Sequence, residues 1–177
     1  MKIFKSFAIC LPLICAACGA NEGKTVYLGD YLAEGDALTD AMPALRAALA
    51  EVKTSKASKL VLPGGELRLR PDKAIEKYQF ISNNDESLKR IAFQLDSIDD
   101  LTIDGNGTHL LFTGFISPFN LENCTNITIE NLSIDFTRTF HSEGTISNVF
   151  NGGIDIMFPE DYRVDIQNGL LRFRDSE

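Results

Sequence analysis

The sequence predicts an all-β protein whose central part is a parallel β-helix, a solenoid of short strands stacked coil upon coil. Apolar and polar residues alternate between positions 101 and 136, which is the period of a strand and not of a helix. The alternation slips by one residue between Ile129 and Leu132, so a corner between them is needed to keep both apolar sets inside. Residues 100–106 also resemble residues 126–132, at an offset near one coil and with no helical crossover. These observations favour a solenoid over a β-sandwich.

The composition limits the classes of function. Of the 177 residues, 44% are hydrophobic and 24% are charged, as in an ordinary globular domain. The net charge of −8 disfavours nucleic acids and polyanionic substrates, because both need a basic groove. His109 and His141 lack the spacing of metal ligands, and no motif points to a cofactor, so neither a metal nor a cofactor is expected. Neutral sugars remain open as ligands.

The N-terminus resembles a bacterial lipoprotein signal. Lys2 and Lys5 precede a short apolar run that ends in small residues before Cys18, although Cys15 stands where this pattern usually has leucine. We expect a signal peptide at residues 1–17, lipidation of Cys18 and a tether at residues 18–25. The protein would then be lipid-anchored in the bacterial cell envelope, facing the periplasm or at the cell surface. It would meet the membrane only through that anchor.

Residues 41–52 predict an amphipathic helix, which Thr39 or Asp40 can cap. A solenoid exposes apolar side chains and unpaired strand groups at its end, so we expect this helix to cover the N-terminal end. Its apolar residues fall on one face: Met42, Leu45, Leu49 and Val52.

The first coil is expected directly after this helix. Residues 60–62 and 67–69 are strand-like and flank the turn Pro63-Gly64-Gly65. The stretch from residue 26 to residue 70 resembles the opening of pectin-lyase-like proteins. That resemblance implies a right-handed β-helix and no particular chemistry.

Five sequence blocks follow one another over most of residues 71–140: residues 71–78, 81–85, 88–93, 101–107 and 131–136. In this order they resemble the glycoside hydrolase family of bacterial α-1,3-galactosidases. The resemblance implies release of terminal α-linked galactose with inversion, by carboxylates on coils later than any present here. No catalytic residue is therefore assigned within this chain. Phe136 stands where the family segment has tryptophan, which implies either a changed sugar-stacking surface or a repacked wall.

The pattern changes after residue 140. Two alternating runs flank Asn168-Gly169, a pair suited to a two-residue hairpin turn with both residues at positive φ. We therefore expect residues 26–140 to form the N-terminal part of the β-helix and residues 141–177 to begin an antiparallel β region. About three coils can be counted, which suggests the front part of a longer enzyme that is inactive alone.

Three residues are candidates for binding a sugar: Asp135, Arg138 and Asn83. Asp135 should face outward beside Arg138, although a solvated or ion-paired carboxylate is the commoner role for such a residue. Asn83 could bind hydroxyl groups or simply form a turn. Asn106, Asn123, Asn126 and Asn131 each begin an Asn-x-Ser/Thr sequence, and we interpret them as corner residues rather than glycan acceptors.

Two other functions are weighed against the glycosidase. A noncatalytic carbohydrate-binding or structural solenoid is the alternative. A polysaccharide lyase is disfavoured by the acidic balance and by the lack of a carboxylate cluster for calcium. Cys124 would be the one cysteine of the folded part, and we interpret it as a small buried corner residue.

Overall fold

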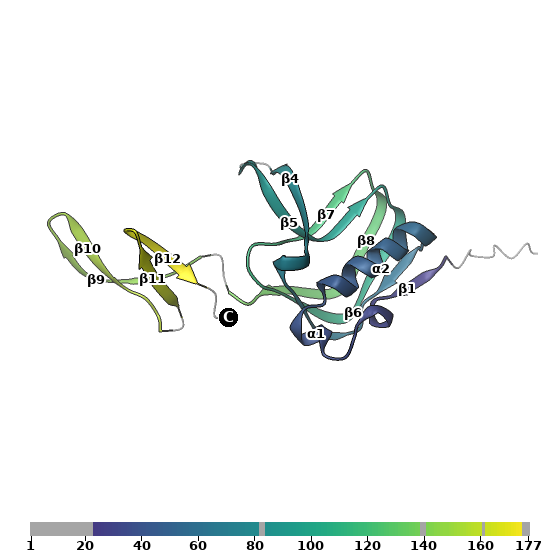
Figure 1. Cartoon of the computed structure of the whole chain (residues 1–177), viewed down its shortest axis with the longest axis horizontal. Coiled ribbons are helices and arrows are strands. Elements are labelled where there is room, and N and C mark those ends of the chain that lie inside the picture. Colours follow the sequence, from purple (N-terminus) through teal and green to yellow (C-terminus); the bar gives the residue numbers. More distant parts are fainter. Residues whose placement is uncertain (1–22, 82–83, 139–140, 161, 175–177) are drawn as a thin grey trace, which may run out of the picture.

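The computed structural model describes residues 23–81, 84–138, 141–160 and 162–174 (Figure 1). In this part of the chain strands predominate and the main sheets are parallel, in agreement with the expected all-β class. The expected signal peptide, Cys18 and Asn83 lie outside the described residues.

The N-terminal elements are β1 (Thr25–Tyr27), the 3-10 turn η1 (Leu28–Tyr31), α1 (Asp36–Thr39) and α2 (Met42–Ser55). No described helix is long and apolar enough to cross a membrane. Helix α2 lies against β1, β2 (Lys59–Val61) and β5 (Asn84–Asp96).

Ala41, and not Thr39 or Asp40, is the N-cap residue of α2, and its side chain makes no capping hydrogen bond. Oδ1 of Asp40 accepts hydrogen bonds from the backbone N–H groups of Met42 and Arg70, each at 3.1 Å, whereas the Thr39 hydroxyl donates back to the Gly35 carbonyl. The expected apolar face of α2 is buried: Met42, Ala44, Leu45, Ala48, Leu49 and Val52.

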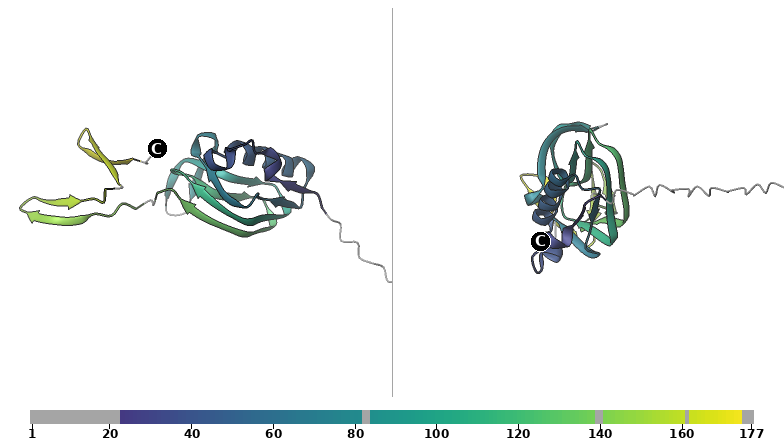
Figure 2. Two further views of the ribbon diagram at one scale, coloured as in Figure 1. Left: turned by 90° about the horizontal axis from the view of Figure 1, so that it is seen from below. Right: turned by 90° about the vertical axis from the view of Figure 1, so that its right-hand side faces the viewer.

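The main sheet is a parallel stack. Strands β2 (Lys59–Val61) and β3 (Gly65–Leu69) both pair with β6 (Asp99–Phe112), and β8 (Thr125–Phe136) pairs with the other side of β6. Apolar residues meet in register. Leu101 pairs with Ile127 and Ile103 with Ile129, as the internal resemblance predicts. Leu60 also pairs with Ile103, and Leu67 with Leu110. The strands surround one apolar core that α2 closes on one side (Figure 2).

Asparagines form the corners of this stack. Asn106, Asn123, Asn126 and Asn131 have φ values of 49°, 50°, 53° and 58°, in the left-handed region that asparagine tolerates better than most residues. Asn126 also donates from Nδ2 to Oδ1 of Asp100, on the neighbouring strand β6, at 2.7 Å. The left-handed φ values support the interpretation of these four residues as corner residues.

The corner after β3 carries an antiparallel hairpin that the sequence analysis does not contain. It follows the short turn η2 (Pro71–Lys73) and consists of β4 (Ile75–Ile81) and β5 (Asn84–Asp96). The second half of β5 then pairs in parallel with β7 (Ser117–Glu122). The hairpin stands up from the sheet body in Figure 1.

Two further hairpins follow β8. The first joins β9 (Thr145–Phe150) to β10 (Gly153–Met157), and the second joins β11 (Arg163–Gln167) to β12 (Leu170–Arg174). The turn of the second consists of Asn168 and Gly169, with φ values of 54° and 75°, so the turn expected from the sequence forms.

Three expectations about burial need correction. Ile129 and Ile134 of β8 should point into a closed core, but their side chains are 37% and 43% exposed. They align with buried residues of β6, and no strand among the described residues covers the other side of β8. Cys124 is half-buried rather than buried, and its Sγ donates to the Glu122 carbonyl at 3.1 Å.

Candidate functional site

An open pocket of about 590 Å³ lies at the corner of β6 and β8. At this corner residues 105–107 of β6 lie opposite Asn131 alone, because the register shifts between Asp104 and Thr108. A Cβ on Gly105 would lie 2.4 Å from the Asn131 carbonyl oxygen, so only glycine fits this close approach. The lining includes Asp104, Asn106, Thr108, Asn131 and Ser133.

Asp104 organises this corner. Its carboxylate forms a 2.8 Å ion pair with Lys59 and accepts 3.0 Å hydrogen bonds from the Asn131 side chain and the Asn106 backbone. The hydrogen bond from Lys59, followed by those from Asn131 and Asn106, lowers the pKa of Asp104 to about 2. The same hydrogen bond raises the pKa of Lys59. Asp104 is therefore ionised at neutral pH, where it accepts hydrogen bonds but has no proton to donate as a general acid.

An outward polar row continues from the pocket along β6 and β8. His109 pairs in register with Ser133, and its Nδ1 lies 2.8 Å from the Ser133 hydroxyl oxygen. Asp135 follows on the same side of β8 and is exposed, with Oδ1 accepting a 2.8 Å hydrogen bond from the Phe136 N–H. Pocket and row together offer hydroxyl, amide and carboxylate groups, the groups that bind sugar hydroxyls.

Arg138 contacts Ser142, Tyr162 and Phe173. Its guanidinium stands over the rings of Tyr162 and Phe173, 5.5 Å and 5.2 Å from their centroids, and donates to the Ser142 hydroxyl. Within the described residues no ion pair joins Arg138 to Asp135. The structure thus brings Asp135 to an open face and uses Arg138 to hold the β11–β12 hairpin.

A second polar cluster, absent from the sequence analysis, ties β4 to β7. Nε2 of Gln79 donates to Oδ1 of the Asn120 side chain at 2.7 Å, and Nδ2 of Asn120 donates to Gln94 at 2.8 Å and to Glu122 at 3.0 Å. Lys77 forms an ion pair with Glu122, and this contact, together with the Asn120 hydrogen bond, lowers the pKa of Glu122. The paired residues are separated by 41 and 45 positions in the sequence, so no local pattern predicts this cluster.

Over the described ranges, no group of three or more histidine, cysteine, aspartate or glutamate side chains is placed to hold a metal ion.

Comparison with known proteins identifies the relatives of this chain. No family model matches it. An alpha-1,3-galactosidase A of Bacteroides fragilis is 35% identical over 166 residues, which cover 90% of this chain and 27% of the relative. An alpha-1,3-galactosidase A of Shewanella woodyi is 30% identical over 97% of this chain, and an alpha-1,3-galactosidase B of Bacteroides thetaiotaomicron is 30% identical over 98% of it. The chain is homologous to the bacterial alpha-1,3-galactosidases.

This result confirms the resemblance that the sequence blocks carry. The homology to alpha-1,3-galactosidases extends over the parallel stack and into the hairpins, since the Bacteroides thetaiotaomicron alignment spans 177 residues. The chain spans 29% of the length of that relative and 27% of the length of the Bacteroides fragilis one.

Proposed function

We propose that this chain forms the N-terminal coils of a right-handed parallel β-helix in an exported α-galactosidase. The observation that carries the proposal is homology to alpha-1,3-galactosidases over at least 90% of the chain. The in-register parallel pairing of β2, β6 and β8 supports the β-helix, because such pairing is how successive coils stack.

The substrate we propose is a glycan that ends in α-1,3-linked galactose, cleaved with inversion. An inverting glycosidase needs two carboxyl groups roughly 6.5–9.5 Å apart, one of which starts protonated. Asp104 does not suit the acid role, because Lys59 and two further hydrogen bonds keep it ionised. We place the catalytic pair outside these 177 residues. The chain then contributes the scaffold and, around Asp135 and the corner pocket, a polar wall for the glycan.

Galactose release tests this proposal. The 177-residue protein and any longer product of the same reading frame are each incubated with α-1,3-galactobiose. The longer product should release β-galactose first, as proton NMR of the fresh product resolves, and the 177-residue protein should release none. Robust hydrolysis by the 177-residue protein would place the catalytic pair inside it and overturn this assignment.

Export and lipidation form part of the same proposal. Lys2, Lys5 and the small residues before Cys18 support a lipoprotein signal and a location in the bacterial cell envelope. Replacing Cys18 with serine in the native host should release the protein from the membrane fraction. Unchanged fractionation with an uncleaved N-terminus would contradict the anchor.

A noncatalytic carbohydrate-binding solenoid is the second candidate. The exposed outward row of His109, Ser133 and Asp135 supports it, since those groups can bind hydroxyls without catalysing a reaction. Binding of α-1,3-galactobiose by a folded longer product that releases no galactose would favour this candidate over the hydrolase.

A further inference from the structure

The β4–β5 hairpin has its polar side turned inward and its apolar side turned outward. Beyond Ile75, which is itself half-buried, the inward residues of β4 are the half-buried Lys77 and Gln79, whereas the alternate residues Tyr78 and Phe80 are 70% and 68% exposed. Leu88 of β5 lies opposite Tyr78 in the register and is 46% exposed. A strand that folds for its own stability does the reverse, burying its apolar alternate residues. We call Tyr78, Phe80 and Leu88 the aromatic platform.

The inward side holds the hairpin in this orientation. Gln79 bonds to Asn120, and Lys77 forms its ion pair with Glu122, so two successive inward residues of β4 are tied to β7. If the hairpin rotated so that the platform became buried, both contacts would break and Glu122 would lose its ion pair with Lys77. The rings are therefore presented by a braced strand, which lowers the entropy lost when a ligand binds.

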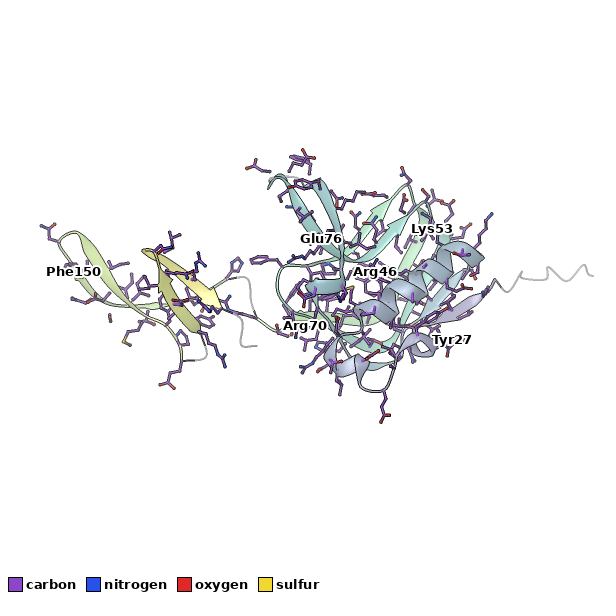
Figure 3. The ribbon with its side chains drawn as sticks, in the orientation of Figure 1. Tyr27, Arg46, Lys53, Arg70, Glu76 and Phe150 are labelled. Atoms are coloured by element: carbon purple, nitrogen blue, oxygen red, sulfur yellow. The ribbon has the colours of Figure 1, made fainter. Side chains whose placement is uncertain are left out.

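We propose that the aromatic platform binds a pyranose ring of the glycan, stacked on the faces of Tyr78 and Phe80. Aromatic faces carry negative charge density that attracts the C–H groups of a sugar, and the Tyr78 hydroxyl can bond to sugar hydroxyls. Beside the platform Glu76 and Arg90 form a 3.1 Å ion pair and offer further acceptors and donors; Figure 3 shows Glu76 on the raised hairpin. The inference rests on the proposed function only in taking a sugar as the ligand.

Size and charge favour a sugar over a protein or a membrane. An aromatic side chain buries about 150–250 Å² at most, so three side chains supply much less than the roughly 800 Å² per partner of a stable protein interface. One or two sugar rings need no more than this. The net charge of −8 disfavours an anionic lipid surface.

Isothermal titration of the full 177-residue chain with α-1,3-galactobiose tests the inference. Tyr78→Ala and Phe80→Ala should each weaken binding about fivefold, the size expected for loss of one stacked ring. Tyr78→Phe keeps the ring and should bind within about twofold of the wild type, because stacking and not the hydroxyl dominates. Tyr27→Ala is the matched control: Tyr27 is also an exposed strand tyrosine but lies on β1, away from the hairpin (Figure 3), and its loss should leave affinity unchanged.

Three results would overturn the platform: no binding by the wild type, equal affinity of the doubly substituted Tyr78→Ala/Phe80→Ala chain, or an equal loss in Tyr27→Ala. Sedimentation of the same variants identifies a protein interface, because substitutions that dissociate an oligomer while sparing sugar affinity would also overturn it. The proposed function fails separately. If a longer product released no galactose but still bound the sugar through Tyr78 and Phe80, the hydrolase proposal would be wrong and the aromatic platform would be retained.

Discussion

Ile103 and Ile129 occupy the same register position on neighbouring parallel strands, yet Ile103 is fully buried and Ile129 is exposed. Ile103 lies between Leu60 of β2 and Ile129 of β8, whereas Ile129 has a strand neighbour on one side only. Burial in this sheet therefore depends on whether a further strand lies alongside, as well as on the direction of the side chain.

The first prediction compares these two isoleucines. Ile103→Ala should lower the free energy of unfolding by about 3 kcal/mol, because it leaves a cavity between two strands. Ile129→Ala should cost about 1 kcal/mol, since water already reaches that side chain. Urea unfolding followed by far-UV circular dichroism measures both. Equal losses would mean that something covers β8 in solution.

Gly105 gives the second prediction. A methyl group there would meet the Asn131 carbonyl oxygen and the Leu132 Cβ, each at 2.4 Å, so Gly105→Ala should destabilise the protein by about 2 kcal/mol. Gly29→Ala is the control, because a Cβ on Gly29 has no atom within 4 Å. Thermal unfolding of the two variants should separate them clearly. Similar melting temperatures would show that the corner can open to admit a side chain.

The third prediction concerns acid stability. Because folding lowers the pKa of Asp104 from its ordinary value of 3.8 to about 2, the stability that its carboxylate contributes is present above about pH 4 and is lost as the pH falls toward 2. Asp104→Asn should thus be less stable than the wild type at pH 7, and the difference should shrink between pH 4 and pH 2. Asp135→Asn, at an exposed carboxylate, should track the wild type. If Asp104→Asn and the wild type differed in stability by the same amount at pH 7 and at pH 2, the lowered pKa of Asp104 would not be what stabilises the fold.

The fourth prediction addresses Arg138. Arg138→Ala removes the cation that stands over Tyr162 and Phe173, so amide hydrogen exchange in β11 and β12 should accelerate. Arg138→Lys should restore little protection, because an ammonium lacks the planar surface that stacks on a ring. Arg163→Ala, on the exposed side of β11, is the matched control and should leave exchange unchanged. Unaltered exchange in Arg138→Ala would show that the hairpin is held by other contacts.

Local patterns in the sequence were enough to predict several elements. The apolar face of α2, the Asn168-Gly169 turn and the asparagine corners each depend on residues close in sequence, and all three form. The outward position of Asp135 follows from the alternation in β8 and also agrees with its exposure.

The rest depends on contacts that no local pattern encodes. The alternation in β8 predicts which way Ile129 points, but it carries no information about what lies beyond that strand. The β4–β5 hairpin escapes prediction because its aromatic residues face outward, against the rule by which strands are recognised. Arg138 has its ring partners at Tyr162 and Phe173, more than 20 residues later in the chain, so the local pattern around Asp135 carries no information about them.

The hairpin also bears on how relatives of this protein can diverge. From Leu69 to Ile91 the chain passes through η2 and the β4–β5 hairpin, whereas residues 113–116 alone join the matching positions Phe112 and Ser117. The same corner is thus a tight bend at residues 113–116 and a hairpin insertion between Leu69 and Ile91. The strands on either side of the corner keep their register. Because lengthening a loop adds closure entropy only slowly, such excursions can be acquired, exchanged or trimmed at little cost to the scaffold. Substitutions at this corner can therefore change which ligand binds without disturbing the stacked strands that stabilise the fold.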